Sequence, residues 1–403
     1  MKIIELFAGI GACSKALTNL GIEHEIVDAV EIDKYAIKSF NAVHGTNFEP
    51  QDITKWDKDI KVDLIMHGSP CQDFSVAGLG KGGDKDSGTR SSLMYETLRI
   101  VEKLKPKYVI WENVKNLLSK KHRHNFDAYL EAMEKLGYEN HYQVLNAKDY
   151  GIPQNRQRVF TVSILGGGDF EFPEPIPLEK KLNDMLEENV DERYYLSDDK
   201  AMKLSVKEKA VSNTVRAGGR GSLDRHQWDC VKVVGRLDIK GHDQIKRVYV
   251  KDGVPPTITT MDGGNRQPKI IDDYNGNIRK DQETIGTLTT NCGVSAPRNG
   301  WKIAEPFCVA SRGRGENNEQ HLEPRKDGNT NTITSVQKDN YIATPYRIRK
   351  LTEVECWKLM GFEKSDCEKA RASGISKTQL YKQAGNSIVV KVLEAILKEL
   401  LNA

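Results

Sequence analysis

The chain has 403 residues, of which 38% are hydrophobic and 29% charged, proportions typical of a globular protein. No apolar stretch is long enough to cross a bilayer, and the first residues lead directly into a strand pattern, so we expect no membrane partner, no signal peptide and a cytoplasmic protein. The seven cysteines are scattered without a Cys-x-x-Cys pair, which argues against a disulfide framework and predicts no metal site.

The net charge of +3 is unevenly distributed along the chain. Residues 200–270 contain 15 Lys and Arg against 7 Asp and Glu, so the remainder is mildly acidic. A basic segment of this kind indicates either a polyanion partner or simply a solvated charged face, and composition alone does not separate the two.

The first elements resemble a nucleotide-binding unit. A strand at Lys2–Phe7 precedes the turn Ala8–Ala12, with glycines at 9 and 11, and a second strand at Glu25–Val30 is followed by Glu31. A glycine turn with an acidic residue about 20 positions later suits a cofactor ribose. The third glycine of the dinucleotide fingerprint is replaced by Ser14, which disfavours a pyrophosphate but not an adenosyl cofactor. A plain strand–helix turn remains the alternative.

A cysteine at the end of the next apolar strand is a candidate nucleophile. The run Val62–Met66 is followed by Gly68-Ser69-Pro70-Cys71 and then by a glycine-rich stretch, so the thiol lies where a buried strand meets a loop. A lone cysteine at a strand end is more often inert. Between these elements Asp52 could accept from an adenine amino group or could cap a turn.

The remaining pattern alternates strands with helices, which predicts an α/β fold with a doubly wound, mostly parallel sheet. We expect Glu112 at the carboxyl end of the strand 107–111. The other expected elements are helices at 34–43, 91–105 and 125–136, strands at 138–145 and 158–165, and, near the C-terminus, helices at 352–360 and 389–401.

The pattern of alternating strands and helices ends after Leu165, where a triple glycine and three prolines mark a boundary. Apart from a helix expected at 178–188, short β-like runs dominate up to about residue 346. Four Thr-containing echoes, at 213–216, 256–259, 286–289 and 331–334, indicate repeated loop–strand units or merely good strand composition. We expect a catalytic, cofactor-binding domain at 1–167 and 378–403, and a smaller β-rich target-recognition domain at 168–377.

Three groups at loop-side strand ends fit chemistry on a pyrimidine ring. A thiolate from Cys71 adding to carbon 6 of cytosine would make carbon 5 nucleophilic. Glu112 could then protonate or hydrogen-bond the ring nitrogen, and Arg158 could hold the carbonyl oxygen. A base within a duplex must be flipped out for this chemistry.

At this point the sequence resembles the DNA (cytosine-5) methyltransferase family of the bacterial or phage type. The ordered segments that carry the resemblance are Phe7–Gly11, Glu31, Pro70-Cys71-Gln72, Arg90–Leu93, Glu112-Asn113-Val114, Gln154–Arg158, Arg347, Leu351–Cys356 and Gln383–Ser387. They span 3–165 and 346–390, whereas residues 166–344 give no residue-level match.

The resemblance implies S-adenosylmethionine as cofactor and double-stranded DNA as substrate, as in restriction–modification or phage protection. The implied catalytic residues are Cys71, Glu112, Arg156 and Arg158. The implied cofactor-binding residues are Phe7, Ala8, Gly9, Ile10, Gly11, Glu31, Ile32, Asp52, Pro70, Leu93, Asn386 and Ser387. Expected DNA contacts are Gln72, Ser75, Arg90, Arg216, Arg220, Lys246, Arg247 and Arg266.

Two departures and three alternatives remain. Ile32 stands where the family often has an adenine-stacking aromatic, and Lys358 replaces a frequent arginine. The alternatives are a tRNA-methylating relative, a catalytically inactive binding protein and a dinucleotide-dependent dehydrogenase. The long variable segment disfavours the first, the intact Cys71 and Glu112 the second, and the Pro-Cys-Gln loop the third. We also expect a monomer associated with the nucleoid, and the resemblance allows a separately encoded restriction endonuclease.

Overall fold

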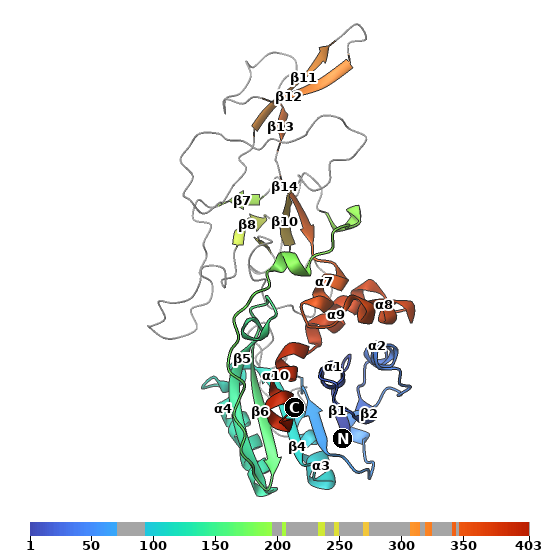
Figure 1. The fold of residues 1–403 in the computed structure, drawn as a ribbon, viewed down its shortest axis with the longest axis vertical. Helices are drawn as coiled ribbons and strands as arrows, with labels where there is room; N and C mark the ends of the chain where they lie inside the picture. The colour runs from blue at the N-terminus through green and yellow to red at the C-terminus, as the bar shows by residue number, and fades with distance from the viewer. Residues whose placement is uncertain are drawn as a thin grey trace.

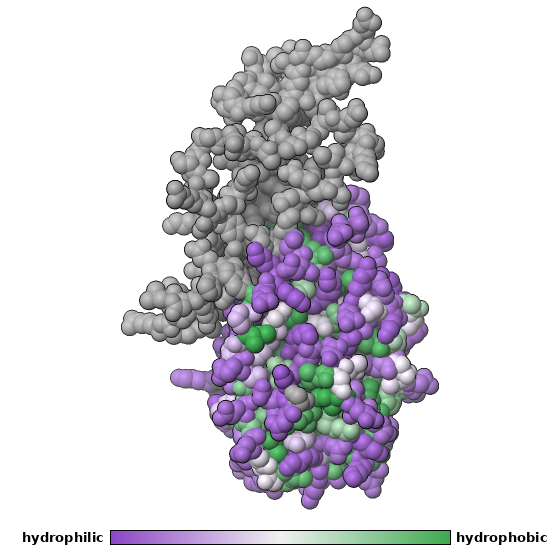
Figure 2. All heavy atoms as spheres, in the orientation of Figure 1, coloured by the Kyte–Doolittle hydropathy of each residue, from purple (hydrophilic) through white to green (hydrophobic). Residues whose placement is uncertain are grey.

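The computed structural model describes residues 1–70, 93–195 and 346–402, together with short segments at 204–206, 233–237, 246–249, 269–273, 307–314, 319–324 and 341–343. Within this described part, no helix is both long and apolar enough to span a membrane. Figure 2 shows polar side chains over most of the visible face of the described body, with apolar ones in scattered patches.

A six-stranded sheet forms the centre of the described body, in the order β2-β1-β3-β4-β6-β5 (Figure 1). In this sheet β6 alone runs antiparallel, between β4 and β5, which confirms the expected mostly parallel arrangement. The strands are β1 Lys2–Leu6, β2 Glu25–Val30, β3 Leu64–His67, β4 Tyr108–Val114, β5 Tyr138–Asn146 and β6 Gln157–Leu165.

Helices cover both faces of this sheet. On one face lie α1 Ala12–Asn19 and α10 Val390–Leu401, and on the other lie α3 Met94–Leu104 and α4 Arg123–Lys135. The helices α7 Glu353–Lys358, α8 Lys364–Ala372 and α9 Lys377–Asn386 pack against one another and against α2 Lys34–His44. Successive strand residues point to opposite faces. Accordingly Ile3 packs in one hydrophobic cluster with α1 and α10, whereas Ile4 packs in another with α3 and α4. The helix α10, close to the C-terminus, therefore packs against the same face of the sheet as α1, at the strand formed by the first residues.

Short 3₁₀ turns connect several elements, at Ile53–Lys55, Lys115–Leu118, Ala147–Tyr150, Leu182–Met185 and Glu192–Tyr194. The capping box expected at the start of α7 is confirmed: Thr352 Oγ1 accepts from the Glu355 amide at 3.2 Å, and the Thr352 amide donates to Glu355 Oε2 at 2.8 Å. These reciprocal bonds satisfy donors that every helix start leaves unpaired.

Two smaller sheets lie beyond the central one in Figure 1. One has the order β14-β10-β9-β8-β7 and the other the order β12-β11-β13. Their strands are β7 Leu204–Val206, β8 Val233–Leu237, β9 Arg247–Tyr249, β10 Lys269–Asp273, β11 Phe307–Arg314, β12 Glu319–Pro324, β13 Tyr341–Ala343 and β14 Tyr346–Lys350. The four Thr-containing echoes lie outside the described residues.

Two expectations about local structure are wrong. Glu112 does not end its strand, because β4 continues to Val114 and pairs with β6 along its whole length, with Glu112 opposite Phe160. The helix expected at 178–188 is only the 3₁₀ turn Leu182–Met185. Leu182 and Met185 are buried three residues apart, so a single turn already satisfies the apolar spacing that suggested a helix.

Candidate functional site

The turn between β1 and α1 has an unusual backbone. Phe7, Gly9 and Gly11 have φ values of 54°, 56° and 81°. A Cβ on Gly11 would lie 2.1 Å from Nε2 of His44, so only glycine fits there. His44 Nε2 in turn lies 3.1 Å from the carbonyl of Ile10. A left-handed phenylalanine is strained, and such strain concentrates at ligand sites.

Glu5, which the sequence analysis missed, lies on β1, and its side chain binds the first amides of α1. Its carboxylate accepts from the amides of Cys13 and Ser14, at 3.2 and 2.9 Å, and from the Ser14 hydroxyl. Burial raises the pKa of this carboxyl group. Ser14, in place of the third glycine, is therefore a partner of Glu5, and a carboxylate already occupies the donors that a pyrophosphate would use. An acidic residue inside an apolar strand was the available signal.

Glu31 closes the other side of this turn. Its Oε2 accepts from the Gly9 amide at 3.0 Å and its Oε1 from the Asp33 amide at 2.8 Å. Burial raises the pKa of the Glu31 carboxyl group, and the two amide bonds act in the opposite direction. The next residue, Ile32, is 71% exposed. A half-buried carboxylate therefore lies beside an exposed apolar side chain at the ends of β1 and β2.

The remaining cofactor candidates lie on segments around this turn. The Gln51 amide donates to the carbonyl of Glu31 at 2.8 Å, which brings Asp52 close to the same edge. Asp52 caps its 3₁₀ turn by accepting from the amide and hydroxyl of Thr54, at 3.0 and 2.8 Å. Ala8 and Ile10 are buried, Asn386 is exposed at the end of α9, Ser387 is buried, and Pro70 and Leu93 are half-buried.

Glu112 and Arg158 meet on one face of the β4–β6 pair. Val114 is opposite Arg158 and Glu112 is opposite Phe160, so alternate side chains place the two charged groups diagonally across the strands. Arg158 Nε lies 3.1 Å from Glu112 Oε1, and both side chains are largely buried. Among the described residues this buried carboxylate oxygen has no hydrogen-bond donor despite the ion pair. Glu112 Oε1 can therefore accept a hydrogen bond from a bound ligand.

The residues before Cys71 are fixed beside this ion pair. Ser69 is buried, and its hydroxyl accepts from Trp111 Nε1 at 3.0 Å. Asn113 Nδ2 lies 3.4 Å from the Ser69 carbonyl, so side chains on both sides of Glu112 hold the same residue. A Cβ on Gly68 would lie 3.8 Å from Glu112 Oε2. The strand that leads to Pro70 therefore ends against Glu112.

The segment Gln154–Arg158 contacts three separate parts of the chain. Gln154 Nε2 donates to the Leu359 carbonyl at 2.7 Å, and Arg156 Nη2 donates to the Ser387 carbonyl at 2.8 Å. Arg158 faces Glu112. The structure thus places the guanidinium of Arg156 on the segment after α9, where it holds that segment in position, and its expected role in a cytosine pocket stays a prediction.

Several predicted site residues lie outside the described part of the chain: Cys71, Gln72, Ser75, Arg90, Arg216, Arg220 and Arg266. Lys246 and Arg247 are described and half-buried, at the start of β9. Of the described cysteines, Cys13, Cys356 and Cys367 are all buried free thiols. Burial raises the pKa of each, for Cys367 to about 12, so these three thiols are poor nucleophiles at neutral pH.

A second residue missed from the sequence is Arg349, on β14. It is fully buried, and its two terminal nitrogens each lie 2.9 Å from an oxygen of Glu355. Glu355 Oε1 also accepts from the Glu187 amide at 2.8 Å. This bidentate pair joins β14 to α7 and to the segment after β6. The sequence analysis singled out Arg347 instead, two residues earlier on the same strand.

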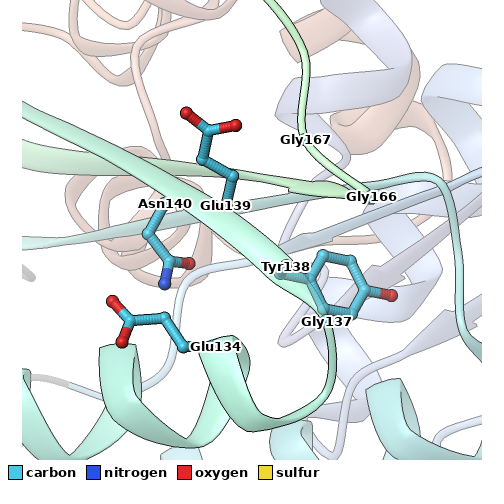
Figure 3. A pocket seen from close by; sticks show the side chains of 7 residues that line it. All are labelled: Glu134, Gly137, Tyr138, Glu139, Asn140, Gly166 and Gly167. Carbon is cyan, nitrogen blue, oxygen red and sulfur yellow. The ribbon is translucent and has the colours of Figure 1, made fainter.

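One hollow in the described surface lies away from Glu31, Glu112 and Arg158. It has a volume of about 510 Å³ and is lined by the end of α4, the start of β5 and the glycines after β6 (Figure 3). Its charged residues are Glu134 and Glu139. None of the predicted site residues lines this hollow.

Comparison with known proteins agrees with the geometry. Residues 1–402 match the family described as C-5 cytosine-specific DNA methylase. The chain is 34% identical to an orphan methyltransferase of Bacillus phage rho11s, over 100% of this chain and 98% of the relative. It is equally identical, with the same coverage, to a putative type II methyltransferase of Bacillus subtilis strain 168.

Among solved structures, the fold is similar to that of a methyltransferase from Entamoeba histolytica, with a TM-score of 0.59 and 15% identity over 100% of this chain and 98% of that one. It is also similar to a putative DNA modification methyltransferase encoded within an E. coli prophage, with a TM-score of 0.56 and 18% identity over 100% and 99% of the two chains. At these identities the likeness concerns the fold alone.

Proposed function

The chain belongs to the C-5 cytosine-specific DNA methylases, and on this premise we propose that it transfers a methyl group from S-adenosylmethionine to carbon 5 of a flipped-out cytosine in a specific duplex sequence. It is a DNA cytosine-5 methyltransferase by family; the cofactor, the flipped base and the residue roles are the proposal. Defence by restriction–modification and protection of a phage genome are both compatible with it.

The residues at the ends of β1 and β2 fit an adenosyl cofactor. A carboxylate offers about four lone-pair sites, and Glu31 uses one from each oxygen for backbone amides, which leaves others for ribose hydroxyls. Ile32 and Asp52 would lie against the adenine, and Phe7–Gly11, Pro70, Leu93, Asn386 and Ser387 would surround the remainder. Glu5 at the start of α1 disfavours a dinucleotide. When bound, S-adenosylmethionine supplies the electrophilic methyl group.

The observation that carries the proposal is the Glu112–Arg158 pair on β4 and β6, which lies beside Gly68, three residues before Cys71. The Cys71 thiolate would form a bond to carbon 6 of cytosine, which moves an electron pair toward the ring nitrogen and carbonyl oxygen. Glu112 would donate a proton or hydrogen bond to N3 and would accept from the exocyclic amino group, and Arg158 would stabilise the carbonyl oxygen. After methyl transfer, loss of the proton from carbon 5 and release of the thiolate would restore the aromatic ring.

We assign target recognition to residues 168–377, with the two smaller sheets as its framework. Lys246, Arg247 and the other basic residues of 200–270 would contact phosphates, whereas Arg216, Arg220 and Arg266 would read base edges. Gln72, Ser75 and Arg90 would contact DNA from the segment around Cys71. A monomer and a nucleoid location complete this proposal, and a separately encoded cognate endonuclease is compatible with it.

The test is bisulfite-type sequencing of DNA from cells that express the chain, with Cys71→Ser as the matched control. We expect protected cytosines in one sequence context in the first sample and none in the second. Methylation of tRNA with no protected cytosine in DNA would contradict the proposal. Replacing residues 168–344 with those of a relative of different specificity should change the context, and an unchanged context in a folded, active hybrid would refute the recognition assignment.

A further inference from the structure

Charge is segregated along the segment that follows the catalytic strand β4. Residues 115–124 contain four Lys or Arg, two His and no acidic residue, whereas residues 127–139 contain four Asp or Glu and one Lys. The first group occupies the 3₁₀ turn Lys115–Leu118 and the start of α4, and the second runs down α4 into β5. We call residues 115–124 the basic segment.

The basic segment begins next to the proposed base pocket. Lys115 follows the strand that bears Glu112, and its Nζ donates to Gln157 Oε1 at 3.1 Å, between Arg156 and Arg158. Leu117 is fully buried and anchors the turn, whereas Lys120 and Lys121 are exposed. The exposed charges are therefore presented from a fixed backbone at the edge where cytosine would enter.

An arginine and an exposed aromatic ring extend this surface. The Arg123 guanidinium lies 5.5 Å from the Phe126 ring centre and 5.7 Å from that of Tyr142. It also donates to the Tyr142 hydroxyl at 3.3 Å and to Asp127 Oδ1 at 2.7 Å. Tyr142 is 41% exposed. These contacts hold the guanidinium in place, with Asp127 as its carboxylate partner.

The arrangement opposes the helix dipole, which favours acidic residues in the first turn of a helix and basic ones in the last. The first turn of α4 has no acidic residue. Its 13 residues rise about 20 Å at about 1.5 Å each, more than twice the Debye length of about 8 Å in physiological salt. The acidic end, with Glu134 and Glu139 in the hollow of Figure 3, is therefore screened from an anion at the basic end.

From the position, exposure and sign of these charges we infer that the basic segment is a second DNA-backbone contact surface, which holds the duplex phosphates on the catalytic side of the target cytosine. The inference rests on the proposed function. It assigns phosphate binding to a part of the chain separate from the basic residues 200–270, and it predicts no contribution to sequence choice because phosphates carry no sequence information.

The test measures binding of a random-sequence DNA duplex to the full-length protein at salt concentrations from about 50 to 200 mM. Each neutralised phosphate contributes about 0.9 to the slope of log affinity against log salt. We expect Lys120→Gln/Lys121→Gln to lower the slope by about 2, and Lys120→Arg/Lys121→Arg to keep it. The methylated sequence context and the single-turnover rate at saturating DNA should stay at the wild-type values.

The matched control is Lys135→Gln/Lys398→Gln, which removes two exposed lysines elsewhere and should leave the slope unchanged. An unchanged slope in the Lys120/Lys121 variant, an equal fall in the control, or a loss of tRNA binding with duplex binding intact would each overturn the inference. Failure of the wild-type protein to methylate DNA would instead refute the proposed function, so the two claims fail separately.

Discussion

Two parts of the central sheet hold their glutamates, Glu31 and Glu112, in different ways. We call the ends of β1 and β2 the first half, and the end of β3 with the adjoining parts of β4 and β6 the second half. At the ends of β1 and β2, Glu31 is bound by backbone amides of Gly9 and Asp33. Where β3 ends beside β4 and the start of β6, Glu112 faces the side chain of Arg158, and its buried oxygen receives no hydrogen bond among the described residues. In the first half, main-chain amides fix both oxygens of the carboxylate before any ligand binds, whereas in the second half one carboxylate oxygen still lacks a donor among the described residues.

This difference suggests that the first half binds the cofactor and that the second half takes part in the chemical step. A carboxylate fixed by main-chain amides suits a binding role, because its position does not depend on another side chain. A buried carboxylate with an unfilled acceptor, beside an arginine, suits a group that gains interactions as charge develops on a substrate. We therefore expect substitutions in the first half to change cofactor affinity and those in the second to change the chemical step.

The largest effect should come from Cys71→Ser, which removes the proposed nucleophile. Oxygen is a far weaker nucleophile than a thiolate at neutral pH, so single-turnover methylation should fall by about four orders of magnitude or more. Duplex and cofactor affinities should stay near the wild-type values. Activity close to wild type would remove Cys71 from the mechanism.

Glu112→Gln should slow single-turnover methylation by about 10²- to 10⁴-fold, because an amide can still hydrogen-bond but cannot deliver a proton. The dissociation constant for S-adenosylmethionine, measured by calorimetry, should not change. A loss of cofactor affinity with a normal chemical step would place Glu112 in the first half and break the comparison.

Glu31→Ala should show the reverse pattern. Loss of hydrogen bonds to a charged group, about 1.5–3 kcal/mol, predicts S-adenosylmethionine binding about 10- to 100-fold weaker. At saturating cofactor the single-turnover rate should be near normal. Glu31→Gln, which can still accept from one amide, is the matched control and should have an intermediate cofactor affinity. A rate defect that saturating cofactor does not correct would contradict the separation of cofactor binding from the chemical step.

Acid should lower the free energy of unfolding, because the structure holds two histidines in surroundings that favour the neutral ring, the half-buried His44 and the buried His67. Burial lowers the pKa of His44 to about 4 and that of His67 to about 3, from an ordinary 6.5. Below pH 6.5 the unfolded chain binds protons that the folded protein excludes, so stability is full above pH 6.5 and falls as pH decreases toward those folded values. Each of the two histidines contributes up to about 1.4 kcal/mol per pH unit to the slope of the unfolding free energy against pH.

Urea unfolding from pH 7.5 to 4.5 measures that slope. His67→Phe retains a ring against Trp111, with which His67 stacks at 5.7 Å, and His44→Gln retains a donor for the Ile10 carbonyl. Each substitution should reduce the pH slope of the unfolding free energy. An unchanged slope in both variants would mean that other groups control the acid response.

The sequence located the elements of this edge more accurately than the contacts between them. Hydrophobic alternation predicted β2 at Glu25–Val30, and the Thr352–Glu355 spacing predicted the start of α7. Local pattern could not show that β4 extends past Glu112, because that extension depends on pairing with β6, more than 40 residues later in the chain.

The same limit explains the missed residues. Glu5 looks like one polar position in a strand until the fold brings the start of α1 against it. Arg349 becomes significant only where Glu355 and Glu187 converge on it. The family resemblance supplied the roles of Cys71, Glu112 and Arg158, but it did not indicate that Arg156 is directed to the carbonyl of Ser387.

Covalent trapping tests the central claim, that bond formation to cytosine belongs to the second half of the edge. Duplex DNA with 5-fluorocytosine at the target, incubated with S-adenosylmethionine, should form a stable adduct, because the fluorine on carbon 5 cannot leave as a proton does. Mass spectrometry should map the adduct to Cys71 in the wild-type protein, and in Glu31→Ala at saturating cofactor. An adduct on another residue, or none although ordinary DNA is methylated, would contradict the account.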